Sequence, residues 1–108
     1  MTKVTINPGI CGFTTKVTAE ADEDKENVVI RAASGCKAIS DMMKALGEEF
    51  DAFEFCLVKP GKGPLYEFAS SGDFPVHASC PVLAGIIKCA EAECGLALKK
   101  NAEIIFED

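Results

Sequence analysis

Thiols are the side chains of this sequence best suited to chemistry, because the chain has six cysteines but one histidine, one tyrosine and no tryptophan. Cys11, Cys36 and Cys80 each stand at the boundary of an expected helix or strand, and Cys56 lies within a long segment of loop-forming residues. Thiolates bind zinc and iron–sulfur clusters, and four of them from separate segments could close a tetrahedral site.

The first hypothesis is therefore a metal-binding module in which these four cysteines hold zinc or an iron–sulfur cluster. His77 precedes Cys80 by three residues and could be a spare ligand or a hydrogen-bond donor to one. The four cysteines are separated by 25, 20 and 24 residues. These gaps match neither the paired spacing of zinc sites nor a ferredoxin pattern, so the spacing adds no support.

Two other hypotheses stay open. Cys36 and Cys80 are expected at the start of helices, where the partial positive charge favours a thiolate. Either could therefore be the nucleophile of a thiol-redox or thiol-transfer protein, with His77 as a base for Cys80. In the third hypothesis the chain is a protein-interaction module and its cysteines pack as small apolar residues. Cys89 and Cys94 are expected to pack in this way in any case.

Composition limits the partners. The 108 residues are 48% hydrophobic, which supports one globular domain over residues 1–108. The net charge of −6 argues against a protein that binds nucleic acid. The N-terminus lacks a signal-peptide core, and the longest mainly apolar stretch, residues 82–87, is too short to span a membrane. We expect a cytoplasmic protein with reduced thiols, for which a protein partner is possible.

Periodicity predicts the elements that position these thiols. Residues 3–6 alternate in polarity like a strand, and residues 13–21 and 28–33 do so as an antiparallel hairpin. Apolar residues at helical spacing predict an amphipathic helix that ends at Gly47 and a second helix from Pro81 to Gly95. Residues 104–106 are predicted to form a final strand.

Residues 48–80 are predicted to be mainly loop, with Glu48–Asp51 extending a helix and Leu65–Ala69 forming one turn. A loop of this length is unusual in a compact domain unless something holds it. The order of elements predicts an α+β two-layer sandwich, an antiparallel sheet with two main helices on one face. The residues expected in its core include Val17, Ile30, Leu46 and Ile86.

Three segments carry a resemblance to a known family: Ile10–Thr15, Gly63–Glu67 and His77–Val82. They resemble a small family of domains of unknown function, with cysteines, from anaerobic prokaryotes. The resemblance covers nearly the whole chain and implies no activity. The positions that match the family pattern are Cys11, Cys36, Cys56, His77 and Cys80, whereas Cys89 and Cys94 fall outside it.

Overall fold

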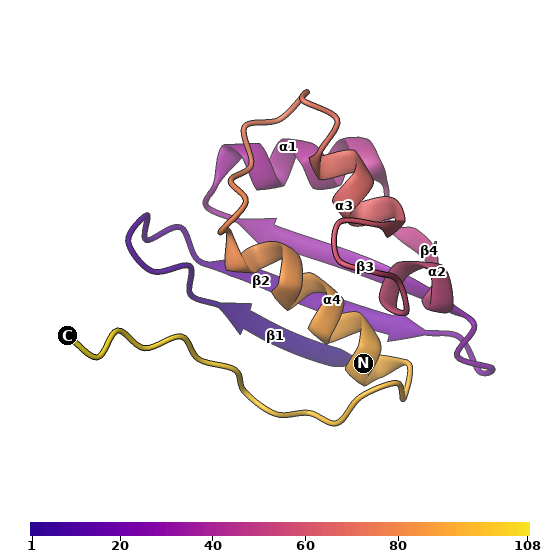
Figure 1. Ribbon diagram of the computed structural model, residues 1–108. Helices are drawn as coiled ribbons and strands as arrows, with labels where there is room; N and C mark the ends of the chain where they lie inside the picture. Colours follow the sequence, from indigo (N-terminus) through magenta and orange to yellow (C-terminus); the bar gives the residue numbers. More distant parts are fainter.

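The computed structural model describes residues 1–108, which form a four-stranded antiparallel sheet with four helices packed on one face (Figure 1). The strands lie in chain order across the sheet: β1 (Thr2–Ile6), β2 (Thr15–Ala21), β3 (Asn27–Ser34) and β4 (Glu49–Asp51). The helices are α1 (Lys37–Leu46), α2 (Ala52–Cys56), α3 (Gly63–Ala69) and α4 (Pro81–Glu93). The predicted α+β class and its two layers are confirmed.

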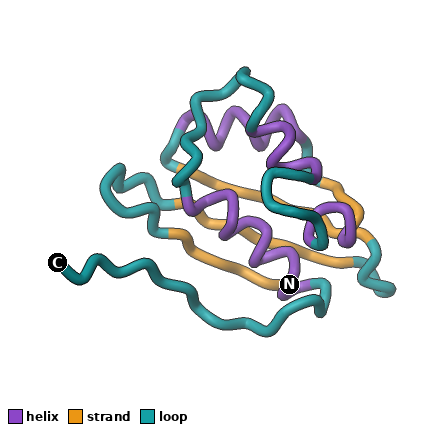
Figure 2. The backbone as a smooth tube through the Cα atoms, viewed as in Figure 1, coloured by secondary structure: helices purple, strands orange, loops and turns teal.

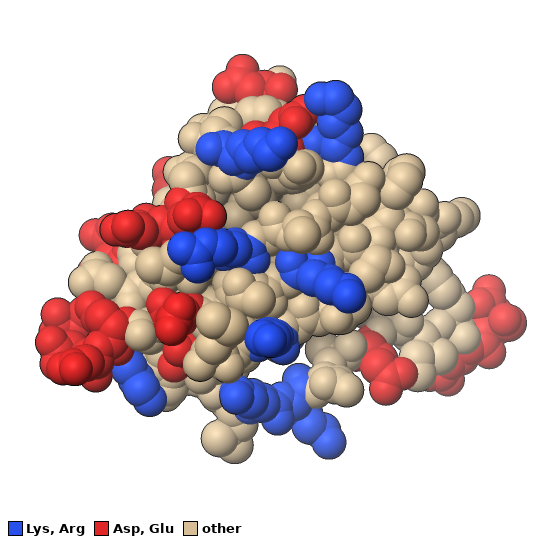
Figure 3. All heavy atoms as spheres, turned by 180° about the vertical axis from the view of Figure 1, so that it is seen from behind, with Lys and Arg blue, Asp and Glu red and all other residues tan.

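Strands β2 and β3 form the predicted hairpin, in which Ala19 lies opposite Ile30. Along β2 the side chains of Val17 and Ala19 are buried, whereas those of Lys16 and Glu20 are exposed. Successive side chains of a strand point to opposite faces, so the helices cover one face and leave the other to solvent. Figure 3 shows the molecule from behind, with Lys and Arg side chains spread across the middle of this view.

The two main helices begin where the sequence predicts, directly after Cys36 and Cys80. Gly47 follows α1 with a φ of 96°, a conformation that residues with a side chain rarely adopt. Pro81 is the first residue of α4. At this position the backbone N–H has no partner within the helix, so proline, which lacks an N–H, costs no hydrogen bond there. No helix of the structure is long and apolar enough to cross a membrane.

Two predicted elements are wrong. Residues Glu49–Asp51 do not extend a helix but form β4, in which Phe50 lies opposite Val28. The remainder of the predicted loop contains α2 and α3, which fix it to the core. The predicted strand at Ile104–Phe106 is absent, since residues 99–108 contain no helix or strand. A strand needs a hydrogen-bonded neighbour, and no other strand of the chain pairs with this segment.

The apolar core lies between the sheet and the helices, and it contains most of the residues predicted for it. Val17, Ile30 and Ile86 are fully buried. Leu46 is only half-buried, so its predicted place inside the core is not confirmed. It is the last residue of α1, where the helix ends and its side chain packs against the rim of the core.

Helix α4 runs antiparallel to β1. Near its start, a methyl group on Gly85 would overlap the side chain of Ile6, the last residue of β1. Further along, the Cys89 thiol donates a hydrogen bond to the carbonyl oxygen of Thr2 at 3.4 Å. At its end, a carboxylate oxygen of Glu93 accepts a hydrogen bond from the Thr2 hydroxyl at 2.8 Å. The first strand and the last helix are therefore fixed to each other along their whole length.

Glu93 also completes the hydrogen bonding of β2. Its second carboxylate oxygen accepts from the backbone N–H of Ala21 at 3.0 Å, beyond the first residue of β1, where that amide has no residue of β1 to pair with. Desolvation raises the pKa of the Glu93 carboxyl, but the bonds from Ala21 and Thr2 and the charge of the Met1 amino group outweigh it. The pKa of Glu93 therefore lies below its ordinary value of 4.5.

We expect Glu93→Gln to lower the free energy of unfolding by about 1–2 kcal/mol at neutral pH, because a charged acceptor of two hydrogen bonds is lost. Since the folded pKa is lowered, the contribution of Glu93 is fully present above its ordinary pKa and is lost as the pH falls through the folded pKa. Urea denaturation of both proteins at neutral and at acidic pH measures this. A difference that stays the same at both pH values would contradict the assignment.

Candidate functional site

Three of the predicted ligand cysteines lie on connections that meet at one end of the sheet, which we call the loop end (Figure 2). It consists of residues 7–14 between β1 and β2, residues 35–36 between β3 and α1, and residues 77–80 before α4. The register explains the meeting, because Ile6 lies opposite Thr15 and Thr15 lies opposite Ser34. The start of α4 joins them because this helix runs antiparallel to β1.

Cys36 is placed by a short hydrogen-bonded junction between β3 and α1. The hydroxyl oxygens of Thr15 and Ser34 lie 2.7 Å apart, and the Ser34 hydroxyl accepts from the N–H of Cys36 at 3.1 Å. Cys36 is the residue before the first turn of α1, it is half-buried, and its side chain makes no capping hydrogen bond. Its thiol is therefore held at the start of a helix without being used as a cap.

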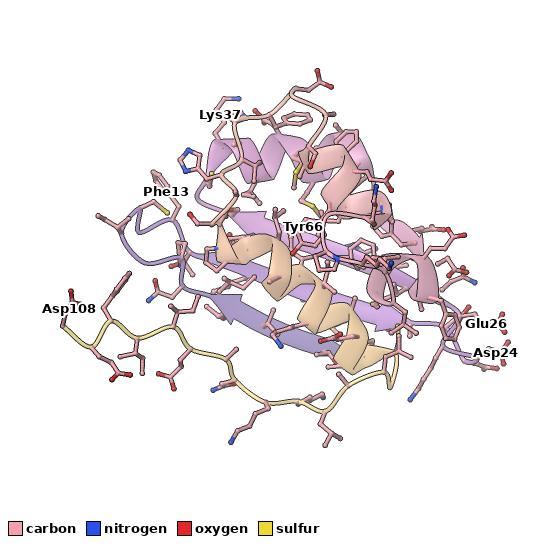
Figure 4. The ribbon with its side chains drawn as sticks, in the orientation of Figure 1. Phe13, Asp24, Glu26, Lys37, Tyr66 and Asp108 are labelled. Atoms are coloured by element: carbon pink, nitrogen blue, oxygen red, sulfur yellow. The ribbon has the colours of Figure 1, made fainter.

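Cys11 lies on the β1–β2 loop, which turns at Gly9 and Gly12, both with positive φ. Its side chain is exposed. Phe13 anchors the loop, because a methyl group on Gly35 would lie 3.4 Å from the Phe13 ring. In Figure 4, Phe13 lies at the same end of the molecule as Lys37, the first residue of α1.

Cys80 occupies the start of α4 as Cys36 does that of α1. A turn precedes it, in which the N–H of Cys80 donates to the carbonyl of His77 at 3.1 Å. Cys80 is half-buried and its side chain makes no capping hydrogen bond, while His77 is exposed. The predicted position of both cysteines before the first turn of a helix is confirmed.

Cys56 lies away from the loop end. It is the last residue of α2 and is half-buried near Cys94 and Glu91, at the far end of α4 from Cys80. Burial, together with the charges of Cys94 and Glu91, raises the pKa of the Cys56 thiol to about 12. At neutral pH this thiol is protonated in the metal-free chain, and a protonated thiol is a poor nucleophile.

Cys89 and Cys94 are buried, which confirms that they pack in the core. Burial is the main reason that the pKa of the Cys89 thiol is raised to about 11, and burial also raises the pKa of Cys94. The Cys89 thiol donates into the sheet at the carbonyl oxygen of Thr2. These two residues behave as small apolar side chains with a weak hydrogen-bond donor.

The structure contains no group of three or more His, Cys, Asp or Glu side chains that could hold a metal ion. The ligand set of Cys11, Cys36, Cys56, Cys80 and His77, with zinc or an iron–sulfur cluster, therefore stays a prediction. Four members of that set belong to the loop end, and Cys56 does not. Cys56 is separated from the other four residues because of the direction in which α4 runs. The spacing of the cysteines in the sequence does not indicate that direction.

Comparison with known proteins places the chain in a family. No curated protein and no solved structure matches it. The model of a family of unknown function, DUF6951, matches residues 2–106, which include all three connections of the loop end. The chain therefore belongs to DUF6951, a family of unknown function.

Proposed function

We propose that the protein is a cysteine-based metal-binding module whose ligands are Cys11, Cys36, Cys80 and His77. The observation that supports this is that the four residues lie on connections that meet at the loop end. Three thiolates and one imidazole are a ligand set that zinc prefers. An anaerobic setting, as the resemblance implies, would keep these thiols reduced and would also allow an iron–sulfur cluster.

Binding requires the β1–β2 loop to move, because the four donors are not gathered into one group. Cys11 is exposed on a loop that bends at two glycines, so it can approach the half-buried thiols of Cys36 and Cys80. Metal binding would therefore close the loop end and stabilise the folded chain.

The test uses the full chain, purified and kept reduced without oxygen, with Zn²⁺ and Co²⁺ as probes and with iron and sulfide analysis of the purified protein. We expect one equivalent of Co²⁺ to give thiolate charge-transfer absorption that Zn²⁺ displaces. At free metal 100-fold above Kd the stabilisation is about 2.7 kcal/mol. For a domain of roughly 100 residues this raises the Tm by about 10 °C or more.

Serine variants locate the site. Cys36→Ser and Cys80→Ser should abolish the Co²⁺ absorption and the increase in Tm. Cys56→Ser is the matched control, because this cysteine is also half-buried but lies away from the loop end. Retention of Co²⁺ binding in Cys36→Ser and Cys80→Ser, loss of it in Cys56→Ser, or no binding of either metal and no iron or sulfide in the wild type would overturn the proposal.

A second candidate, thiol exchange at Cys80 or Cys36, is favoured by one observation: both thiols are free, and each lies before the first turn of a helix. In this reaction a thiolate attacks a disulfide of another molecule, forms a mixed disulfide and releases the other sulfur as a thiolate. The same samples test it. Rapid alkylation of one thiol near neutral pH, lost in Cys80→Ser or Cys36→Ser, with no metal bound, would favour exchange over metal binding.

A further inference from the structure

The C-terminal tail, residues 97–108, carries four large apolar side chains that nothing in the chain covers. Leu98, Ile104, Ile105 and Phe106 are between 69 and 94% exposed. No backbone N–H or C=O group of the tail takes part in a hydrogen bond. Three of them, Ile104–Phe106, are consecutive, and soluble proteins rarely expose a contiguous apolar patch unless it binds something.

The sheet has an uncovered edge on the side where the tail begins. β1 is the first strand of the order and pairs only with β2, so alternate N–H and C=O groups of its outer side have no partner. In Figure 1 the tail leaves the end of α4 and extends on the β1 side of the sheet. One molecule therefore carries both an unpaired strand edge and an unpaired extended segment.

The side-chain pattern of the tail matches the two faces of β1. In an extended tail Ala102, Ile104 and Phe106 share one face, while Glu103 and Glu107 lie on the other with Ile105 between them. On β1 the corresponding faces are the half-buried Val4 and Ile6 toward the helices, and the exposed Lys3 and Thr5 toward solvent. A strand added here would therefore place its apolar face beside the edge of the core.

The charges match as well. Lys3 lies on the uncovered face of the sheet in line with Thr18 and Arg31, and Lys16 is exposed on the same face. Glu103 and Glu107 of an added strand would point to this face, where Lys3 is on the neighbouring strand, while Lys16 and Glu20 lie one strand further away on β2. Opposite charges on neighbouring strands favour pairing, and like charges oppose it. The match holds for a parallel or an antiparallel strand, because it depends only on which face each residue occupies.

We propose that residues 102–107 of one copy add as a fifth strand to β1 of a second copy, so that two copies exchange tails. Within one chain the tail makes no hydrogen bond to β1. The last backbone hydrogen bond before the tail runs from the N–H of Leu96 to the carbonyl of Glu91 at 2.8 Å. In a two-fold exchange the β1 edge of each copy pairs with the tail of the other copy. No β1 edge and no tail is then left unpaired, so the assembly closes at two copies.

The first test is the mass of the full chain in solution, measured by light scattering with a reducing agent present so that Cys11 forms no disulfide between copies. We expect a species of twice 11.5 kDa that dissociates on dilution. Ile104→Asp should leave the chain monomeric, with an unchanged circular dichroism spectrum. Leu98→Asp is the matched control, since Leu98 is as exposed but lies before the added strand, and it should stay dimeric.

Charge reversal distinguishes exchange between copies from closure on the same chain. One variant carries Lys3→Glu and Lys16→Glu, and the other carries Glu103→Lys and Glu107→Lys. In each variant alone tail and edge repel, so the dimer should weaken by at least about tenfold. Mixed together, the tail of either variant meets an edge of opposite charge on the other, so a heterodimer should form.

Three results would overturn the proposal. The first is a wild type that stays monomeric at every concentration, with tail amides that exchange freely. The second is a monomer whose tail amides are protected, which would mean that the tail closes on its own β1. The third is a dimer held together by another surface. It would show as a dimer that persists in Ile104→Asp, or as charge variants that form no heterodimer when mixed.

Discussion

Replacing Phe55 with alanine is expected to lower the free energy of unfolding by about 3–5 kcal/mol. Phe55 is the largest fully buried side chain, 1% exposed, and its ring centroid lies 4.6 Å from that of Phe50 in β4. Helix α2 has five residues, too few to be stable in isolation. Phe55 therefore both fills the core and holds α2 and β4 to it.

Phe53→Ala is the matched control, because Phe53 lies in the same helix two residues earlier and is 51% exposed. Its removal should cost less than about 1 kcal/mol. Urea denaturation, with the midpoint and slope fitted separately, measures both variants. Equal losses in the two variants would show that the orientation of α2 described here is wrong.

The second large effect is expected for Ile86→Ala, at about 2–5 kcal/mol. Ile86 is 0% exposed in the middle of α4, on the face that packs against the sheet. Removing its side chain leaves a cavity between α4 and the strands, and the surrounding residues can fill it only in part. Because α4 joins β1 to the core, we expect the whole chain to unfold at a lower urea concentration in one transition.

Ile10→Ala makes the same chemical change at a fully exposed position of the β1–β2 loop. It should alter the free energy of unfolding by no more than about 0.5 kcal/mol. If Ile86→Ala were as mild as Ile10→Ala, the helical phase that places Ile86 inward would be incorrect. If Ile10→Ala were as costly as Ile86→Ala, the loop would be packed rather than exposed.

Local patterns were enough to predict the hairpin and the two main helices. Apolar and polar residues alternate along β2 and β3 because one face of the sheet is covered. The register of these strands is strongly specified, since a shift of one residue would turn Val17 toward solvent. Gly47 follows the end of α1 because glycine, without a Cβ atom, adopts a positive φ easily. Pro81 begins α4 because the first residue of a helix needs no N–H donor. These features need no knowledge of distant contacts.

Residues 48–80 depend on distant contacts, and local patterns predict them poorly. β4 has three residues and exists because Phe50 lies opposite Val28, 22 positions earlier in the chain. The start of α2 did carry a local signal, since the Asp51 side chain accepts from the N–H groups of Phe53 and Glu54. Glu93 carried a local signal as well. A negative charge at the C-terminal end of a helix interacts unfavourably with the helix dipole, so an acidic residue there indicates a partner elsewhere in the chain.

For the candidate site, the sequence identified the residues but not their grouping. The positions of Cys36 and Cys80 before helices follow from the helix boundaries alone. That Cys56 lies elsewhere follows from the antiparallel course of α4 along β1, which the close approach of Gly85 to Ile6 fixes. This is a contact between residues 79 positions apart, and no pattern of polarity records it.

The pairing of the first strand with the last helix has a consequence for synthesis. A ribosome releases β1, β2 and β3 before α4 exists, and the bond between Thr2 and Glu93 joins residues 91 positions apart. The apolar face of the emerging sheet therefore stays without its main cover until residues 81–93 have left the exit tunnel. During that interval the nascent chain exposes the apolar face of its sheet. Chaperones bind species of this kind, and such species aggregate when translation stalls.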